Sequence, residues 1–299
     1  KGLTSTSTAR SIFKVPDHLR SVNPSAYDPF IIAIGPYHRK NKDFSMMEDH
    51  KMRFMKHFLK RRSEREEDVK KYVEALRALE KEARDHYADG DDEGITSDEF
   101  LTMMLLDGCF ILELLHRFME KLRPRTDSND NQERGTLFSG LIIKRLGRDL
   151  LLVENQLPFC VLQKLFSITA REGNYSLEDM ILCFFSYSRK RNLGSINCGT
   201  WRIKPPPSQN NGKFNSNRNT KNMKFMRCAT ELKEAGIKFR KGKEDSLFAI
   251  KFKNGVMEIP RLEIRGETES IFRNLIVYEN YSTNENEINT NSNMSSVII

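Results

Sequence analysis

The stretch Met104-Leu-Leu-Asp-Gly-Cys-Phe-Ile-Leu-Glu-Leu-Leu115 determines how the rest of the chain must fold. With its flanking residues it predicts a helix over about 98–122 that is apolar on most sides, which is typical of a helix at the centre of a globule. Asp107 and Glu113 interrupt the apolar pattern, so each carboxylate needs a partner or a polar notch in the interior.

Helical spacing extends along the chain on both sides of this central helix. Apolar residues recur three and four apart over 54–59 and 69–87, which predicts an antiparallel helix pair. Further helices are predicted at 158–166, 177–187, 223–235 and 268–278. Alternating apolar residues around Asn254-Gly255 predict a β-hairpin. The fold class is therefore mainly α, a multi-helix globule with a small C-terminal β-hairpin segment.

The N-terminal part is expected to be extended. Prolines at 16, 24, 29 and 36 disfavour helix in the residue before each of them. Residues 15–37 should then form a turn-rich arm, whose apolar side chains hold it against the core.

Composition divides the chain into five segments. We predict a flexible N-terminus (1–14), a helical domain with its extended arm (15–187), a basic disordered insertion (188–222), a helix, hairpin and helix completing the same domain (223–279), and a disordered tail (280–299). The net charge of +8 is concentrated in the insertion, because no Asp or Glu occurs between Met180 and Thr230.

The insertion is the candidate contact for a polyanion, through Arg189, Lys190, Arg191, Arg202 and Lys204. Three interpretations stay open. A solvated linker needs no partner and ranks first, and an anionic membrane surface ranks second. Nucleic acid ranks last, because Trp201 and Phe214 could stack on bases but no nucleic-acid-reading motif accompanies them.

A second candidate site is a polar cluster beside apolar runs, formed by Asp107, Asp149, Glu154, Asn155 and Gln156. Paired carboxylates could perform acid–base chemistry, but buried caps and turn hydrogen bonds explain these residues more simply. The chain contains no phosphate-binding glycine motif, no G-x-S-x-G and no H-E-x-x-H. We therefore predict no catalytic residues, no metal, no cofactor and no small-molecule substrate.

Three weaker signals have simpler structural explanations. Cys160 as a nucleophile would need a base, for which His38 and His116 are candidates in principle. His50 and His57 are too widely spaced for a metal pair and are expected at the surface. The acidic stretch 89–94 does not keep the register of a calcium loop, whereas Thr96 and Glu99 predict a helix-capping box.

Several long stretches together resemble one family. They are Val15-Pro, Asn23-Pro-x-Ala-Tyr-x-Pro29, Ile34-Gly-Pro-Tyr-His38, Met47-Glu-Asp-His-Lys51, Met104 to Leu115, Asp149-Leu-Leu-Leu-Val-Glu-Asn-Gln-Leu-Pro-Phe159, Ala229 to Phe239, Phe252 to Pro260 and Thr268 to Ile276. On these motifs, over about residues 12–280, the chain resembles the plant family called domain of unknown function 247, also catalogued as uncharacterised protein family 0481.

The resemblance implies a plant protein without assigned catalytic residues. It implies recognition or signalling through a protein partner, since some members lie at grass self-incompatibility loci, and plasma-membrane association through a hydrophobic helix near the C-terminus. This chain instead ends in an Asn-rich tail, so we expect a C-terminally truncated member that is cytoplasmic as given. The alternatives are an uncharacterised enzyme with a carboxylate-lined cleft and a polyanion binder.

Overall fold

The computed structural model describes residues 11–39, 44–61, 66–88, 94–122, 140–169, 175–188, 228–242, 250–261 and 264–282. In these ranges helices predominate and only three short strands occur, so the predicted mainly α fold with minor β is confirmed. The chain divides into two compact units, one formed by Lys1–Arg202 with Glu267–Ile299 and the other by Ile203–Gly266.

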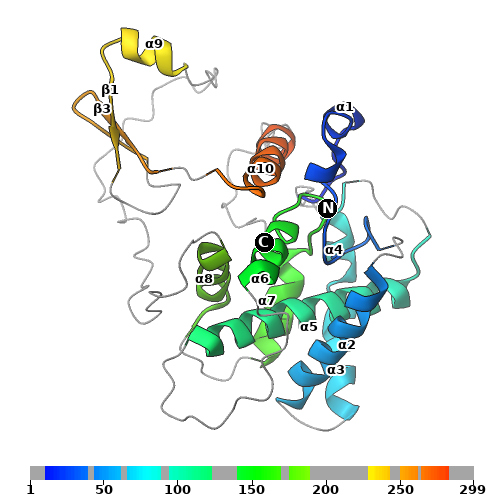
Figure 1. Ribbon diagram of the computed structural model, residues 1–299. Helices are drawn as coiled ribbons and strands as arrows, with labels where there is room; N and C mark the ends of the chain where they lie inside the picture. The colour runs from blue at the N-terminus through cyan, green and yellow to red at the C-terminus, as the bar shows by residue number, and fades with distance from the viewer. Residues whose placement is uncertain are drawn as a thin grey trace, which may run out of the picture. The chain divides into compact units, whose positions relative to one another are not determined.

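The first unit is helical. In chain order its elements are α1 (Asp17–Arg20), the 3-10 helix η1 (Pro24–Ala26), α2 (Ser45–Lys60), α3 (Glu66–Arg77), α4 (Glu80–Asp85), α5 (Ser97–Leu122), α6 (Gly140–Asp149), α7 (Phe159–Thr169), α8 (Leu177–Ser188) and α10 (Thr268–Ser282). Helix α5 is the central helix that the sequence predicts, and it contacts α2, α3, α7 and α8. Figure 1 shows α5 crossing this unit, with α2 and α3 below it and α6 and α8 above it in that view.

Helix α5 begins where its predicted capping box lies. The amide of Glu99 donates to Thr96 Oγ1 at 3.3 Å, and the amide of Thr96 donates to Glu99 Oε2 at 3.0 Å. These reciprocal bonds pair amides that the first helical turn would otherwise leave free. Ser176 and Asp179 repeat the arrangement at the start of α8, with the Asp179 amide 3.1 Å from Ser176 Oγ.

Aromatic side chains fill both flanks of α5. The Phe110 ring lies 5.1 Å from that of Phe54 on α2, and Phe118 packs edge-on against Phe184 and Tyr187 of α8. The apolar stripe 69–87 is not one helix, because the chain turns at Ala78 and Leu79 between α3 and α4. Each part still buries its apolar residues, including Tyr72, Leu76 and Ala83.

The arm (residues 15–37) is extended apart from α1 and η1 and lies on the helices. Its residues Ile32, Ala33 and Ile34 are consecutive and all buried. A second apolar cluster, which includes Val15 and Tyr27 of the arm and Val277 of α10, forms beside the main core. Helix α10 contacts η1 and so belongs with the arm although it lies near the other end of the described chain.

The second unit contains α9 (Ala229–Glu234), β1 (Lys238–Lys241), β2 (Lys251–Lys253) and β3 (Val256–Ile259). The predicted hairpin is confirmed, since β2 and β3 are antiparallel and Asn254 and Gly255 both have positive φ, as the turn requires. Strand β1 was not predicted and pairs in parallel with β3, giving the order β1-β3-β2. Segment 223–279 is thus divided between the units, with α10 in the first and the described residues before Gly266 in the second.

The predicted insertion at 188–222 lies outside the described residues except for Ser188, as do residues 223–227 of the predicted helix 223–235. No described helix has the length and apolar character needed to cross a bilayer.

Candidate functional site

The arm has backbone groups in the interior but no adjacent strand. Ile12, just before it, forms an isolated bridge with Tyr87, and within the described residues the arm itself belongs to no sheet. A buried amide or carbonyl without a partner destabilises the fold, so other groups must pair with the arm backbone. Side chains do this: Lys51, Asp107, Asp149, Glu154 and Asn155 bind the arm backbone, and with Gln156, which supports the loop that carries Glu154 and Asn155, we call this set the polar clamp.

Asp149, the last residue of α6, binds three consecutive amides of the arm. Its carboxylate accepts from Phe30 at 3.0 Å, from Ile31 at 2.6 Å and from Ile32 at 3.2 Å. Arg148 pairs with the same carboxylate at 2.9 Å. Burial raises the pKa of Asp149, and the three amides and the guanidinium oppose that shift. The fully buried carboxylate is therefore held by donors on two sides.

Asn155 pairs with the next part of the arm through both ends of its amide. Its Oδ1 accepts from the Ile34 amide at 2.6 Å, and its Nδ2 donates to the Ile32 carbonyl at 3.0 Å. The side chain thus substitutes for one residue of a neighbouring strand. Gln156 stabilises the loop between α6 and α7 in which it lies, since its Nε2 donates to the carbonyls of Leu150 and Leu152 at 2.8 Å.

Asp107 of α5 accepts from the Gly35 amide at 2.9 Å and from Lys51 Nζ at 2.6 Å. The ammonium of Lys51 also donates to the Ala33 carbonyl at 2.5 Å. Burial alone would lower the pKa of Lys51, but Asp107 and Glu48 raise it, which keeps the ammonium charged. Burial also raises the pKa of Asp107, although Lys51 and the Gly35 amide limit that increase. The central helix is thereby joined to the arm through a buried ion pair.

Gly35 is required where the arm meets the loop between α6 and α7. Its φ is +70°, and a Cβ there would lie 2.6 Å from the Gln156 carbonyl oxygen. That oxygen already accepts from the Tyr87 hydroxyl at 3.1 Å. A side chain at position 35 would therefore combine backbone strain with a collision against a fixed carbonyl.

Glu154 holds the start of the arm. Its Oε1 accepts from the Val15 amide at 2.6 Å, and its Oε2 lies 2.5 Å from Arg20 and 3.1 Å from His38 Nε2. Burial alone would raise the pKa of Glu154, but His38, Arg20 and the Val15 amide lower it below the ordinary value. The charged form is therefore favoured in the folded protein.

Helix α10 and Arg148 pair with three further carbonyls of the arm. Ser270 and Asn274 both donate to the Ala26 carbonyl, at 2.5 and 3.0 Å, and Asn274 Oδ1 accepts from the Val153 amide. Arg148 donates to the carbonyls of Ser25 and Asp28. Helix α10, from the last part of the first unit, is thus bonded to the arm, which comes from its first part.

The structure brings Asp107, Asp149, Glu154 and Asn155 to the arm and places Gln156 beside them. Each of the three carboxylates accepts at least one backbone amide, an arrangement that serves folding. Sequence reasoning identified these residues but missed Lys51, whose motif position gave no sign of burial. Glu113 is also buried and paired, with Arg61 at 2.9 Å and Arg117 at 2.6 Å.

The other predicted residues have different surroundings. Cys160 does not meet His38 or His116, and its neighbours are Glu82 and His86. Burial, with a further contribution from Glu82, raises the pKa of the Cys160 thiol to about 11, which disfavours a thiolate nucleophile. His57 is exposed and His50 is half-buried. The candidate polyanion contacts Arg189, Lys190, Arg191, Arg202 and Lys204 lie outside the described residues.

The chain is similar to proteins of known sequence over nearly its whole length. A family model, DUF247, described as "Plant protein of unknown function", matches residues 12–296. The UPF0481 protein At3g47200 of Arabidopsis thaliana is 30% identical over 310 residues, which cover 93% of this chain and 63% of that protein. The putative UPF0481 protein At3g02645 of the same plant is 29% identical over 177 residues, 58% of this chain and 30% of its own length. This chain thus spans less than two thirds of either relative, and no solved structure matches it.

The clamp predicts that Asp149→Asn strongly destabilises the first unit. The amide side chain would turn an NH₂ group towards amides that now share a carboxylate, and it would leave Arg148 without its buried counter-charge. We expect a loss of about 3 kcal/mol in the free energy of unfolding, measured by urea denaturation. Asp98→Asn is the control, because Asp98 pairs with Arg77 at an exposed position and should change stability by less than about 0.5 kcal/mol. Equal effects of the two substitutions would contradict the role given to Asp149.

The lowered pKa of Glu154 predicts a pH-dependent contribution to stability. A carboxyl group whose pKa falls on folding stabilises the folded state above its ordinary value of 4.5, and this contribution is lost as pH falls through the lowered folded-state pKa. The difference in free energy of unfolding between the wild type and Glu154→Gln should therefore be largest near neutral pH and narrow in acid. Denaturant titrations over a pH series measure it, and a difference that does not change with pH would refute this assignment.

Proposed function

The chain belongs to the plant protein family DUF247, and from that premise we propose that it is a recognition protein that acts through protein–protein contacts rather than through catalysis. The observation that carries the proposal is an exposed apolar face on the sheet of the second unit. The clamp carboxylates also support a role without catalysis, because each of them already accepts a hydrogen bond from the backbone of the arm.

The strand register defines this face. Phe239 of β1, Met257 of β3 and Phe252 of β2 are direct partners across the sheet, so their side chains share one face. Ile259 and Ile250 lie two residues from Met257 and Phe252 and point the same way. We call these five residues the apolar face.

Four of the five residues of the apolar face are exposed, and Met257 at its centre is 9% exposed. The exposed fractions are 39% for Phe239, 53% for Ile250, 59% for Phe252 and 41% for Ile259. Single exposed apolar residues are normal, but several adjoining ones on one sheet face are typical of a binding surface. Phenylalanine is also among the residues enriched in the centres of interfaces.

The opposite face of the sheet and its rim are basic. Lys238, Arg240, Lys251 and Lys253 occupy the alternate positions together with Val256 and Glu258, whereas Lys241, the partner of Ile259, lies at the edge of the apolar face. Such a surface favours a partner that offers an apolar patch surrounded by carboxylates, since rim charges steer association. The proposed occupant is therefore a protein with an acidic rim.

Two narrower roles are proposals for the longer proteins of the family. One is participation in self-incompatibility, and the other is association with the plasma membrane. Both concern whole relatives, and this chain spans 63% of the length of the first relative compared above.

Phe252→Asp tests the proposal. Proximity labelling in plant tissue should return a set of neighbours for the wild-type chain that Phe252→Asp loses, because a buried charge in an apolar interface is strongly unfavourable. Leu141→Asp is the matched control, since Leu141 is similarly exposed, at 58%, but lies on α6 in the first unit. Neighbours kept by the wild type and Leu141→Asp alone would support recognition through the apolar face. Identical neighbours for all three proteins would overturn it.

A further inference from the structure

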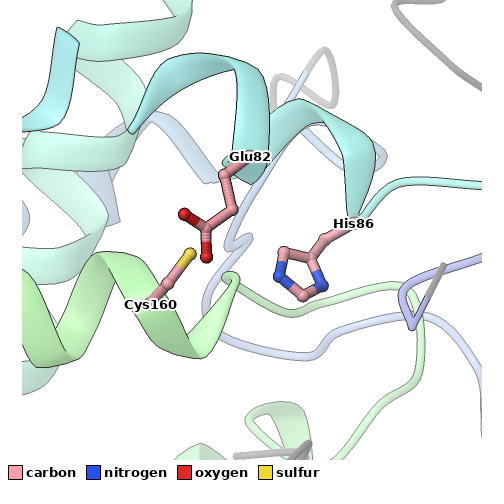
Figure 2. A group of neighbouring side chains, drawn as sticks. All are labelled: Glu82, His86 and Cys160. Carbon is pink, nitrogen blue, oxygen red and sulfur yellow. The ribbon is translucent and has the colours of Figure 1, made fainter. Parts of the chain in front are cut away.

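A side-chain group away from the polar clamp has the composition of a metal site. Glu82 of α4, His86 just after that helix and Cys160 in the first turn of α7 each place one potential ligand atom within 4.8 Å of the others. Figure 2 shows the Cys160 sulfur beside the Glu82 carboxylate, with the His86 ring facing both. Carboxylate, imidazole and thiolate are the three side-chain ligand types that zinc uses in proteins.

We propose that Glu82, His86 and Cys160 bind one zinc-class divalent cation. The sulfur and nitrogen ligands select against magnesium and calcium, which prefer oxygen ligands throughout. Three protein ligands leave a fourth tetrahedral position for water or an external ligand.

The geometry requires only a small adjustment. Ligand atoms around a tetrahedral zinc ion lie roughly 3.5 Å apart, and those of this group already lie within 4.8 Å of one another. Glu82 is exposed and His86 and Cys160 are half-buried, so the glutamate side chain can rotate as the ligands close on the ion. Binding replaces the proton of the Cys160 thiol with the metal, and that proton is released to solvent.

The histidine is already oriented for this role. Ser11 Oγ lies 3.0 Å from His86 Nδ1, and the Ser11 and Ile12 amides both donate to the His86 carbonyl at 3.0 Å. With Nδ1 donating to the hydroxyl, Nε2 presents its lone pair to the other ligands. Partners on the second ring nitrogen are a usual feature of metal-binding histidines.

The position of the group gives the cation a structural consequence. It joins the end of α4 to the start of α7, and through Ser11 and Ile12 it reaches the chain just before the arm. Bound metal should therefore secure residues 11 and 12, next to the arm that the polar clamp holds. The proposal stands independently of the apolar face, which lies in the second unit.

Titration of the full chain, without a histidine tag and after chelator treatment, tests the site. One zinc ion per chain should bind in the presence of excess magnesium, and cobalt(II) should give the charge-transfer absorption of a thiolate ligand. Cys160→Ser should remove that absorption and weaken zinc binding by at least about 100-fold, and Ser11→Ala should weaken it by about 10-fold. Cys228→Ser is the matched control, because Cys228 is a free, exposed cysteine outside the group.

Two results would overturn the site. One is a folded wild-type chain that binds no stoichiometric zinc, and the other is a thiolate absorption that survives Cys160→Ser or disappears in Cys228→Ser. Circular dichroism establishes that each variant is folded. If Cys160→Ser does not fold, His86→Gln serves as the second variant, and unchanged zinc affinity in it equally refutes the proposal.

Discussion

An extended segment can pass through a protein interior only if every amide and carbonyl that leaves water finds a partner. In the arm, side chains rather than an adjacent strand supply such partners. Asp149, Asn155 and Asp107 accept from its amides, and Lys51 and Asn155 donate to its carbonyls. The positions of α2, α5 and α6 relative to the arm follow from these bonds, because each helix contributes one of the donors or acceptors or leads directly into them.

The same constraint explains why polar residues occur inside otherwise apolar motifs. The motif Ile34 to His38 contains Gly35 and the buried amide of Ile34. The motif Asp149 to Phe159 contains Asn155, which accepts from that amide, and Gln156, whose carbonyl lies against Gly35. The motifs Met47 to Lys51 and Met104 to Leu115 supply the Lys51–Asp107 pair, and the motif Thr268 to Ile276 supplies Ser270 and Asn274. Motifs distant in the sequence are thus parts of one hydrogen-bond network. Carboxylates engaged in this way hold the arm on the helices of the first unit.

Much of the fold could be predicted because its signals are local. The apolar pattern of α5, the capping box at Thr96 and the turn at Asn254-Gly255 each depend on residues within a few positions of one another.

Strand β1 was missed because its sequence, Lys-Phe-Arg-Lys, carries no alternating apolar pattern and pairs with a strand further along the chain. The break between α3 and α4 was missed because the apolar stripe continues across it. The residues of the polar clamp other than Lys51 could be predicted, but their partners could not, since only the folded chain brings residue 149 to residue 31. The group of Glu82, His86 and Cys160 is non-local for the same reason.

Native-state hydrogen exchange at the arm amides tests the central claim most directly. If side chains pair with the buried backbone as described, the amides of Ile32, Ile34 and Gly35 exchange as slowly as those in the middle of α5, because all of them open only when the first unit unfolds. Exchange of these three amides as fast as that of the exposed turn at Asn254-Gly255 would contradict the account, since the arm would then separate from an intact helical core.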